Sequence, residues 1–200
     1  MVPTSSQTAN KMSFTCPANF IDSFKIGDNI NYNLTVLSAL YTAYGNADSK
    51  TPLIKPIVII NTSIAEVLLY DFIEFRVRKA NRTEKLFENI LSELNSKKLD
   101  KFSHYITQAE KYDFFEMKDT NFYGAMHNLR ERRNRIHIQN QPFKAPANED
   151  EVFTEKVKML SEKIVEKIVN TLHTRYPRRA EYHGFVRDFE FPWDRHFEAP

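Results

Sequence analysis

The sequence predicts an all-α fold, an antiparallel helical bundle, from three observations. Only four glycines occur in 200 residues. Apolar residues recur at three- and four-residue steps, and the short β-branched runs lie inside longer segments with that helical period. A chain of this length with 42% hydrophobic residues can bury a sizeable core in one domain. We therefore expect a disordered N-terminus over residues 1–14, a helical domain over residues 15–176, and an extended aromatic C-terminal arm over residues 177–200.

The first half of the chain contains the strongest helical pattern. A first helix is expected from Asn19 to Tyr44, although Gly27 and Asp28 interrupt its pattern and are candidates for a break. After a polar loop over residues 45–52, a central core helix is expected from Pro56 to Ala80. Its apolar positions follow helical spacing closely: Ile60, Ile64, Val67, Leu68, Phe72 and Phe75.

Three polar residues lie near the buried side of this central helix: Asn61, Ser63 and Glu66. One interpretation makes them partners of a functional arginine elsewhere in the bundle. The other makes them solvent-facing or capping residues. The sequence leaves both open.

The second half predicts shorter helices and then one long helix. Helices are expected over residues 83–94, with Thr83 as N-cap, and over residues 102–112. Pro142 and Pro146 require a loop over residues 139–147. The last long helix is expected over residues 148–173, with Asn148 and Glu151 as a capping box.

The C-terminal arm combines aromatic residues with five arginines: Tyr182, Phe185, Phe189, Phe191, Trp193 and Phe197, with Arg175, Arg178, Arg179, Arg187 and Arg195. Such a segment either stacks on bases and holds phosphates, or packs over its own core or a partner subunit.

Charge and cysteine content limit the class of protein. The formal net charge is only +2, so nucleic-acid binding would need a local basic patch. Cys16 is the only cysteine, which excludes an intramolecular disulfide and a cysteine-based zinc cluster. The amino terminus lacks the features of a signal peptide, and no apolar run is expected to reach the roughly 18 residues of a membrane span. We expect a cytoplasmic protein with no membrane partner.

The chemically informative stretch spans residues 128–140 and reads NLRERRNRIHIQN. On an α-helix, Arg130, Arg133 and His137 fall on one face, whereas Arg132 points about 140° away from His137. Guanidinium groups match phosphate oxygens, and histidine moves protons near neutral pH. The segment therefore predicts a phosphodiester site, with Asn134 as an orienting residue. His127 either borders this site or packs against the bundle.

The helices read IINTSIAEVLLYDFI, FSHYITQAEK, AMHNLRERRNRIHIQN and FTEKVKMLSEKIVEKIV in chain order. Over residues 56–176 this arrangement resembles the HEPN superfamily, particularly its prokaryotic plasmid- and defence-associated branch. The resemblance implies a small helical bundle that dimerises and often acts as a metal-independent ribonuclease in toxin-antitoxin systems or phage defence. It also implies an antitoxin or defence protein as a partner, and no cofactor or metal.

The family signature is an arginine separated from a histidine by four to six residues, often with a polar residue after the arginine. Arg132 and Arg130 fit with four and six intervening residues, respectively. Arg133 is followed by the polar Asn134 but leaves only three residues before His137. A subset paired with nucleotidyltransferase antitoxins has a modified tyrosine two residues after the histidine. Here Gln139 stands at that position, which argues against that regulation.

Three functions follow from these residues. In the first, His137 acts as general base or acid in RNA cleavage while Arg130 or Arg133 stabilises the transition state. One histidine per chain then favours a site shared by two chains of a homodimer. In the second, the same patch binds RNA or a nucleotide without cleaving it. In the third, the arginines pair with Glu110, Glu116 and Asp119 in a structural or assembly protein.

Overall fold

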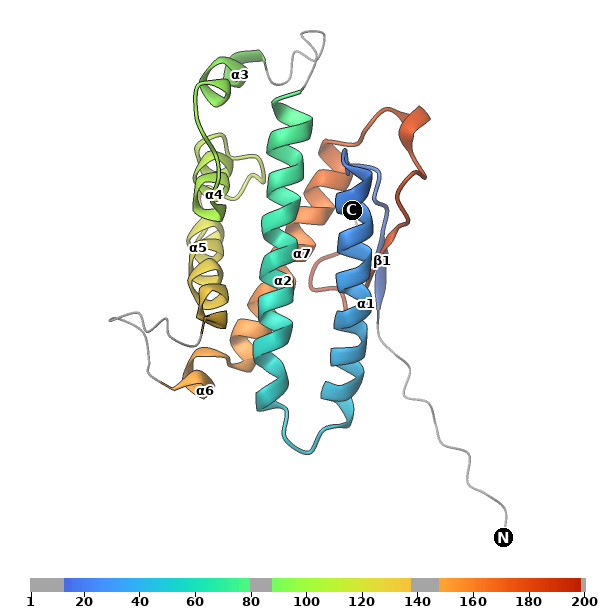
Figure 1. The fold of residues 1–200 in the computed structure, drawn as a ribbon, viewed down its shortest axis with the longest axis vertical. Coiled ribbons are helices and arrows are strands. Elements are labelled where there is room, and N and C mark those ends of the chain that lie inside the picture. The colour runs from blue at the N-terminus through green and yellow to red at the C-terminus, as the bar shows by residue number, and fades with distance from the viewer. Residues whose placement is uncertain (1–12, 80–87, 138–147, 199–200) are drawn as a thin grey trace.

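The computed structural model describes residues 13–79, 88–137 and 148–198, and the fold is mainly helical with one small sheet (Figure 1). The helices are α1 (Phe24–Asn46), α2 (Thr51–Asp71), the π-helix η1 (Phe72–Val77), α3 (Glu88–Asn95), α4 (Phe102–Lys111), α5 (Phe122–Arg133), the 3-10 helix η3 (Asn134–Ile136), α6 (Glu149–Val152), α7 (Glu155–Arg175) and the 3-10 helix η4 (Ala180–Tyr182). The strands are β1 (Phe14–Cys16) and β2 (Phe189–Phe191). The predicted mainly helical class is confirmed, whereas the sheet was not predicted.

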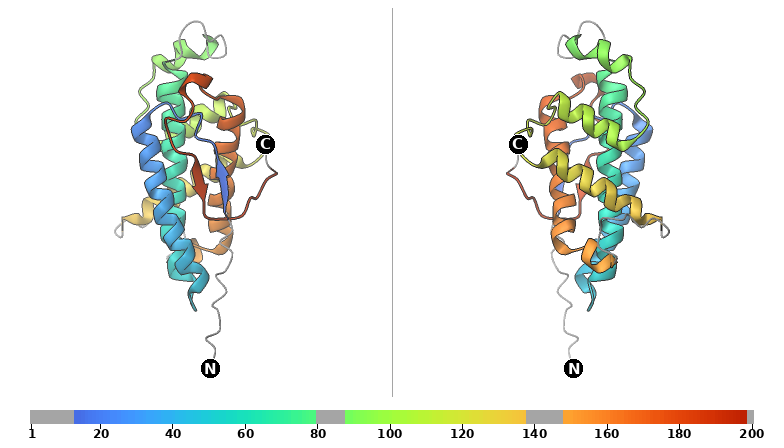
Figure 2. Two further views of the ribbon diagram at one scale, coloured as in Figure 1. Left: turned by 90° about the vertical axis from the view of Figure 1, so that its right-hand side faces the viewer. Right: turned by 90° about the vertical axis from the view of Figure 1, so that its left-hand side faces the viewer.

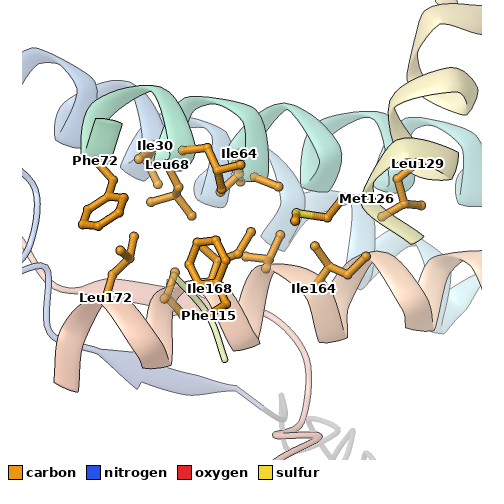
Figure 3. Close-up of a cluster of buried hydrophobic side chains, with 14 of the residues drawn as sticks. Ile30, Ile64, Leu68, Phe72, Phe115, Met126, Leu129, Ile164, Ile168 and Leu172 are labelled. Carbon is orange, nitrogen blue, oxygen red and sulfur yellow. The ribbon is translucent and has the colours of Figure 1, made fainter. Parts of the chain in front are cut away.

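Helix α2 is the centre of the bundle and contacts α1, α4, α5 and α7 (Figure 1). The shared core is drawn in Figure 3 and includes Ile64, Leu68 and Phe72 from this central helix. Facing them are Ile164, Ile168 and Leu172 of α7 and Met126 and Leu129 of α5. The apolar spacing seen in the sequence thus places these three helices around one core.

The central helix starts earlier than predicted, at Thr51, because Pro52 fits the first turn of a helix, where no backbone donor is needed. It continues without a break into η1. Over Thr51–Val77 it is long and apolar enough to cross a membrane, with a mean hydropathy of 1.6 in its most apolar window. This corrects the expectation that no run reaches that length. Half of that window is buried inside the fold, and core helices of soluble proteins meet the same criterion.

Helix α1 runs unbroken through Gly27 and Asp28, so the predicted break is absent. Gly27 is needed for close packing, because a Cβ atom there would lie 2.5 Å from Cγ1 of Val186 in the arm. The helix is capped from a distance: the carboxylate of Asp71 accepts the backbone N–H groups of Asp22 at 2.9 Å and Ser23 at 3.0 Å. These two donors belong to the N-cap residue and the residue before it, so Asp71 fixes the chain where it enters α1.

The helices of the second half match the prediction in part. Helix α4 agrees closely, whereas Thr83 lies outside the described residues. The predicted long C-terminal helix is divided into two. Asn148 precedes a short separate helix, α6, which ends before Phe153, and α7 begins only after that interruption. The cap of α7 is Thr154, whose hydroxyl accepts the Val157 N–H at 3.4 Å. The predicted capping-box start of the long helix is therefore wrong.

The C-terminal arm packs mainly over its own chain. Strand β2 pairs antiparallel with β1, with Phe14 opposite Phe191, so the prediction of disorder is wrong for residue 14, and residues 1–12 lie outside the described residues. Phe189, Phe191 and Trp193 are buried. Tyr182 and Phe185, by contrast, are exposed. Val186 is also buried, whereas Phe197 is 41% exposed, so the arm packs over its own chain at part of its aromatic residues.

Candidate phosphodiester site

Helix α5 positions the arginine-rich segment. Its buried residues follow helical spacing and anchor one side of the helix in the core: Phe122, Tyr123, Ala125, Met126 and Leu129. The last turn then carries Arg130, Arg132 and Arg133. Cations at this end of a helix are stabilised by the negative end of the helix dipole.

The α-helix ends sooner than predicted. It stops at Arg133, tightens to a 3-10 turn over residues 134–136, and leaves His137 extended with ψ 103°. A 3-10 residue turns about 120° rather than about 100°. Arg130 is then roughly 40° from His137 around the axis, and Arg133 roughly 100°. His137 lies beyond the helix in an extended conformation, so the expectation that it shares one helical face with Arg130 and Arg133 is not met.

Arg133 is engaged by the central helix. Its Nη2 donates to Oε2 of Glu66 on α2 at 2.6 Å, and both side chains are about 70% buried. Of the two interpretations of Glu66, partnership with an arginine of the motif is therefore confirmed. Asn61 is buried and donates to the Ser161 hydroxyl at 3.0 Å, and Ser63 donates to its own helix at the Ile59 carbonyl.

Arg135 is the most buried of these arginines, and it ties the motif to α6. It is 7% exposed and donates to Oε1 of Glu149 through Nε at 3.0 Å and Nη2 at 2.9 Å. Lys55 of α2 holds the other oxygen of Glu149 at 2.6 Å. Partial burial works to raise the pKa of Glu149, but the hydrogen bonds and charges of Lys55 and Arg135 outweigh it and lower that pKa.

Arg132 also has a structural contact, because its Nε donates to the Val152 carbonyl at the end of α6 at 3.2 Å. The acidic partners predicted for the arginines are thus wrong in identity. Glu66, Glu131 and Glu149 make the contacts, while Glu116 pairs with Arg175 at 2.6 Å.

Arg130 has a weaker carboxylate contact than Arg133 or Arg135. Its contact with a carboxylate is Nη2 to Oε1 of Glu131, its own neighbour in sequence, at 3.3 Å. The half-buried His127, one turn earlier, lies near enough to respond to its charge. Burial lowers the pKa of His127 below its usual 6.5, and the positive charge of Arg130 lowers it further. His127 is therefore a neutral imidazole at pH 7 and borders Arg130.

His137 is exposed to solvent at the end of the 3-10 turn. Its backbone N–H donates to the Asn134 carbonyl at 3.3 Å. Among the residues described by the structure, its imidazole has no hydrogen-bond or ion-pair partner. Asn134 is half-buried at the start of the same turn.

Sequence reasoning missed Arg135 and the roles of Glu149 and Lys55. No spacing rule could have linked them, because they come from three elements far apart in the chain. The only signal was the position of Glu149 in the first turn after the proline-containing loop, where a carboxylate is favoured. Within residues 13–79, 88–137 and 148–198, no three histidine, cysteine or acidic side chains are grouped to hold a metal ion.

The structure therefore leaves an exposed imidazole and one loosely held guanidinium beside three arginines that tie the motif to the bundle. Comparison with known proteins adds no assignment: no family model, no curated protein and no solved structure matches this chain.

Proposed function

We propose that this chain is a metal-independent endoribonuclease of the toxin or phage-defence type, with a HEPN-type bundle and a site completed by a second copy of the chain in the cytoplasm. The observation that supports this most is the exposed His137, which lies one 3-10 turn after a helix end bearing three arginines. An accessible proton-transfer group beside fixed guanidinium groups is what phosphodiester cleavage requires.

The reaction would proceed by attack of a ribose 2′-hydroxyl on the adjacent phosphorus. His137 of one chain, unprotonated, takes the hydroxyl proton as the new P–O2′ bond forms. His137 of the second chain, protonated, gives its proton to the leaving 5′-oxygen as the P–O5′ bond breaks. The products are a 2′,3′-cyclic phosphate and a 5′-hydroxyl, so no water or external co-reactant is consumed in this step.

The arginines divide into two roles in this proposal. Arg130 stabilises negative charge on the phosphorane oxygens, because its only contact with a carboxylate in the described part of the chain is the weak one to Glu131. Arg133 is a positioning residue, since Glu66 already neutralises its guanidinium. Asn134, at the start of the 3-10 turn, orients the Arg133 guanidinium. His127 borders Arg130 as a neutral hydrogen-bonding group.

The two alternative functions are a structural protein and a silent RNA-binding module. Ion pairs of Arg133 with Glu66 and of Arg135 with Glu149 favour a structural role for those two arginines. They do not account for Arg130 or for the exposed imidazole. A silent RNA-binding module would use the same surface as the nuclease and differs only in turnover.

The test is incubation of the purified full chain with single-stranded RNA in EDTA. Cleavage that yields 2′,3′-cyclic phosphate ends, and that His137→Ala abolishes, supports the proposal. Growth arrest on expression of the wild type but not of His137→Ala supports its assignment as a toxin. RNA bound but not cleaved would favour the silent module. Cleavage by His137→Ala at the wild-type rate would overturn the proposed site.

A further inference from the structure

The seam between α1 and the arm is a second surface with no role in the proposed reaction. The two segments run side by side, as the left view of Figure 2 shows. Phe185 stacks on Phe24 with ring centroids 5.4 Å apart, and the next residue, Val186, packs on Gly27. One turn further along the helix, Asn31 Nδ2 donates to the Arg187 carbonyl at 3.0 Å. The contacts thus follow one stripe of α1.

Large aromatic rings are exposed at the upper end of this seam. Phe24 is 47% exposed, Phe185 61% and Tyr182 47%, although burial of such rings is strongly favourable. Phe24 also lies under the Arg178 guanidinium at 5.4 Å, so one side of the pair is occupied while Phe185 presents its ring to solvent. An exposed stacked pair of this kind offers a flat face to another π-system.

The charge beside these rings is positive. Residues 175–190 contain four arginines against the three carboxylates of Glu181, Asp188 and Glu190, a formal balance of +1. Arg179 and Arg187 are exposed, and no carboxylate in the described parts of the chain pairs with either one. These two guanidinium groups are therefore available for anions in a chain that is almost neutral overall.

The lower end of the seam is a cavity of about 300 Å³, which is within the range of small-ligand sites. Its walls include Leu34, Thr35, Arg187, Glu190 and Phe191, together with Asn31. Asn31 is 9% exposed, and its Oδ1 is buried without a hydrogen-bond partner in the described structure. This atom is closed to solvent, so a ligand in the cavity meets the other wall residues.

We propose that this seam binds a single-stranded segment of the RNA substrate. One base stacks on Phe185, Arg187 contacts the adjoining phosphate, and an unpaired base enters the cavity beside Arg187. Exposed aromatic rings interleaved with arginines are the usual surface for single strands. The identity of the ligand rests on the proposed function, whereas the surface itself lies on elements that do not include the His137 motif.

The experiment measures binding without cleavage, in the His137→Ala background. A fluorescein-labelled octamer of adenosine is titrated with this protein in EDTA, and affinity is read by fluorescence anisotropy. Phe185→Ala should weaken binding about fivefold or more, as expected for loss of one base-aromatic stack. Arg187→Gln should lower the slope of log affinity against log salt by about 0.7, the value for one phosphate contact on a single strand.

Two controls make the result specific. Met159→Ala removes an apolar side chain of α7 that is 46% exposed and takes no part in the seam, and it should leave affinity unchanged. Circular dichroism melts check that each variant is folded.

The outcomes separate this inference from the proposed function. RNA cleavage by the wild type, together with unchanged affinity in Phe185→Ala and Arg187→Gln, overturns the seam and leaves the nuclease standing; the exposed rings would then be assigned to a protein partner. RNA neither bound nor cleaved overturns both. Weaker binding by the two variants, with Met159→Ala unaffected, supports the seam even if cleavage is absent.

Discussion

Two regions of this molecule each bring a histidine together with charged side chains, but their environments are opposite. One is the motif end, residues 130–137. The other lies beneath the arm and consists of Tyr41, Lys158, Glu162, Glu166 and His196, here called the arm network. Glu162 and Glu166 are 3% and 0% exposed. His137 at the motif end is exposed.

The two regions differ in role because the side chains of the arm network have hydrogen-bond partners. Glu162 accepts hydrogen bonds from the Tyr41 hydroxyl and from Lys158 at 2.9 Å, and it contacts the His196 ring at 2.8 Å. Glu166 accepts the backbone N–H groups of His196 and Phe197 at 2.9 and 3.1 Å. Burial and the charge of Glu162 raise the pKa of Tyr41, so this phenol stays protonated and donates. Buried charges that are fully partnered hold the arm, whereas His137 is free to meet a substrate.

Exchanging the two histidines for alanine should separate activity from stability. His137→Ala is expected to lower RNA cleavage about 10²- to 10⁴-fold, because general acid-base catalysis contributes that much, with its melting temperature unchanged. His196→Ala should keep cleavage and lower the melting temperature, since it removes the ring contact with Glu162. Initial rates and thermal melts measure both. Loss of activity in His196→Ala at a temperature where it remains folded would contradict this division.

Asp71 is a limiting case of a buried charge, because its partners are backbone N–H groups. Burial raises its pKa to about 7, and the hydrogen bonds from Asp22 and Ser23 oppose that rise. Protonation is therefore favoured by folding. The resulting stability is complete below the unfolded pKa of about 4 and is lost as pH rises through about 7.

The measurement compares the wild type with Asp71→Asn, which cannot titrate. From pH 4 to pH 8, the wild type should lose up to about 4 kcal/mol of unfolding free energy relative to the variant. Urea titrations at four pH values give this difference, and other titrating groups cancel in it. A difference that does not change with pH would show that Asp71 is ionised throughout.

Removing Glu162 tests the arm network directly. Glu162→Ala leaves Lys158 and Tyr41 buried without their shared acceptor, so unfolding free energy should fall by about 3 kcal/mol. Glu181→Ala removes an exposed carboxylate of the arm and should change it by less than about 0.5 kcal/mol. Urea denaturation distinguishes the two variants. Equal stability of Glu162→Ala and the wild type would mean that the network contributes little.

The sequence predicted the parts of the structure that depend on local pattern. Regular apolar spacing located α2, α4, α5 and α7, and partnership with an arginine was one of the two interpretations offered for Glu66. What it missed depends on contacts between distant segments. Gly27 looked like a helix breaker until Val186 was found against it. The pairing of β1 with β2 joins segments near opposite ends of the chain, and the last turn of α5 makes contacts with α2 and α6. No local pattern encodes these.

The smallest expected effect separates the two arginines that the spacing left open. Arg130→Ala should lower cleavage and cost up to about 1 kcal/mol of unfolding free energy, because its carboxylate contact is weak but its side chain is only 25% exposed. Arg133→Ala and Glu66→Ala should each cost about 1 kcal/mol of unfolding free energy, because their partly buried ion pair joins α5 to α2. Cleavage should fall only slightly in Glu66→Ala, which keeps the Arg133 guanidinium. If Arg133→Ala abolished cleavage and Arg130→Ala did not, the transition-state contact would belong to Arg133, and the 3-10 turn would have to rearrange when RNA binds.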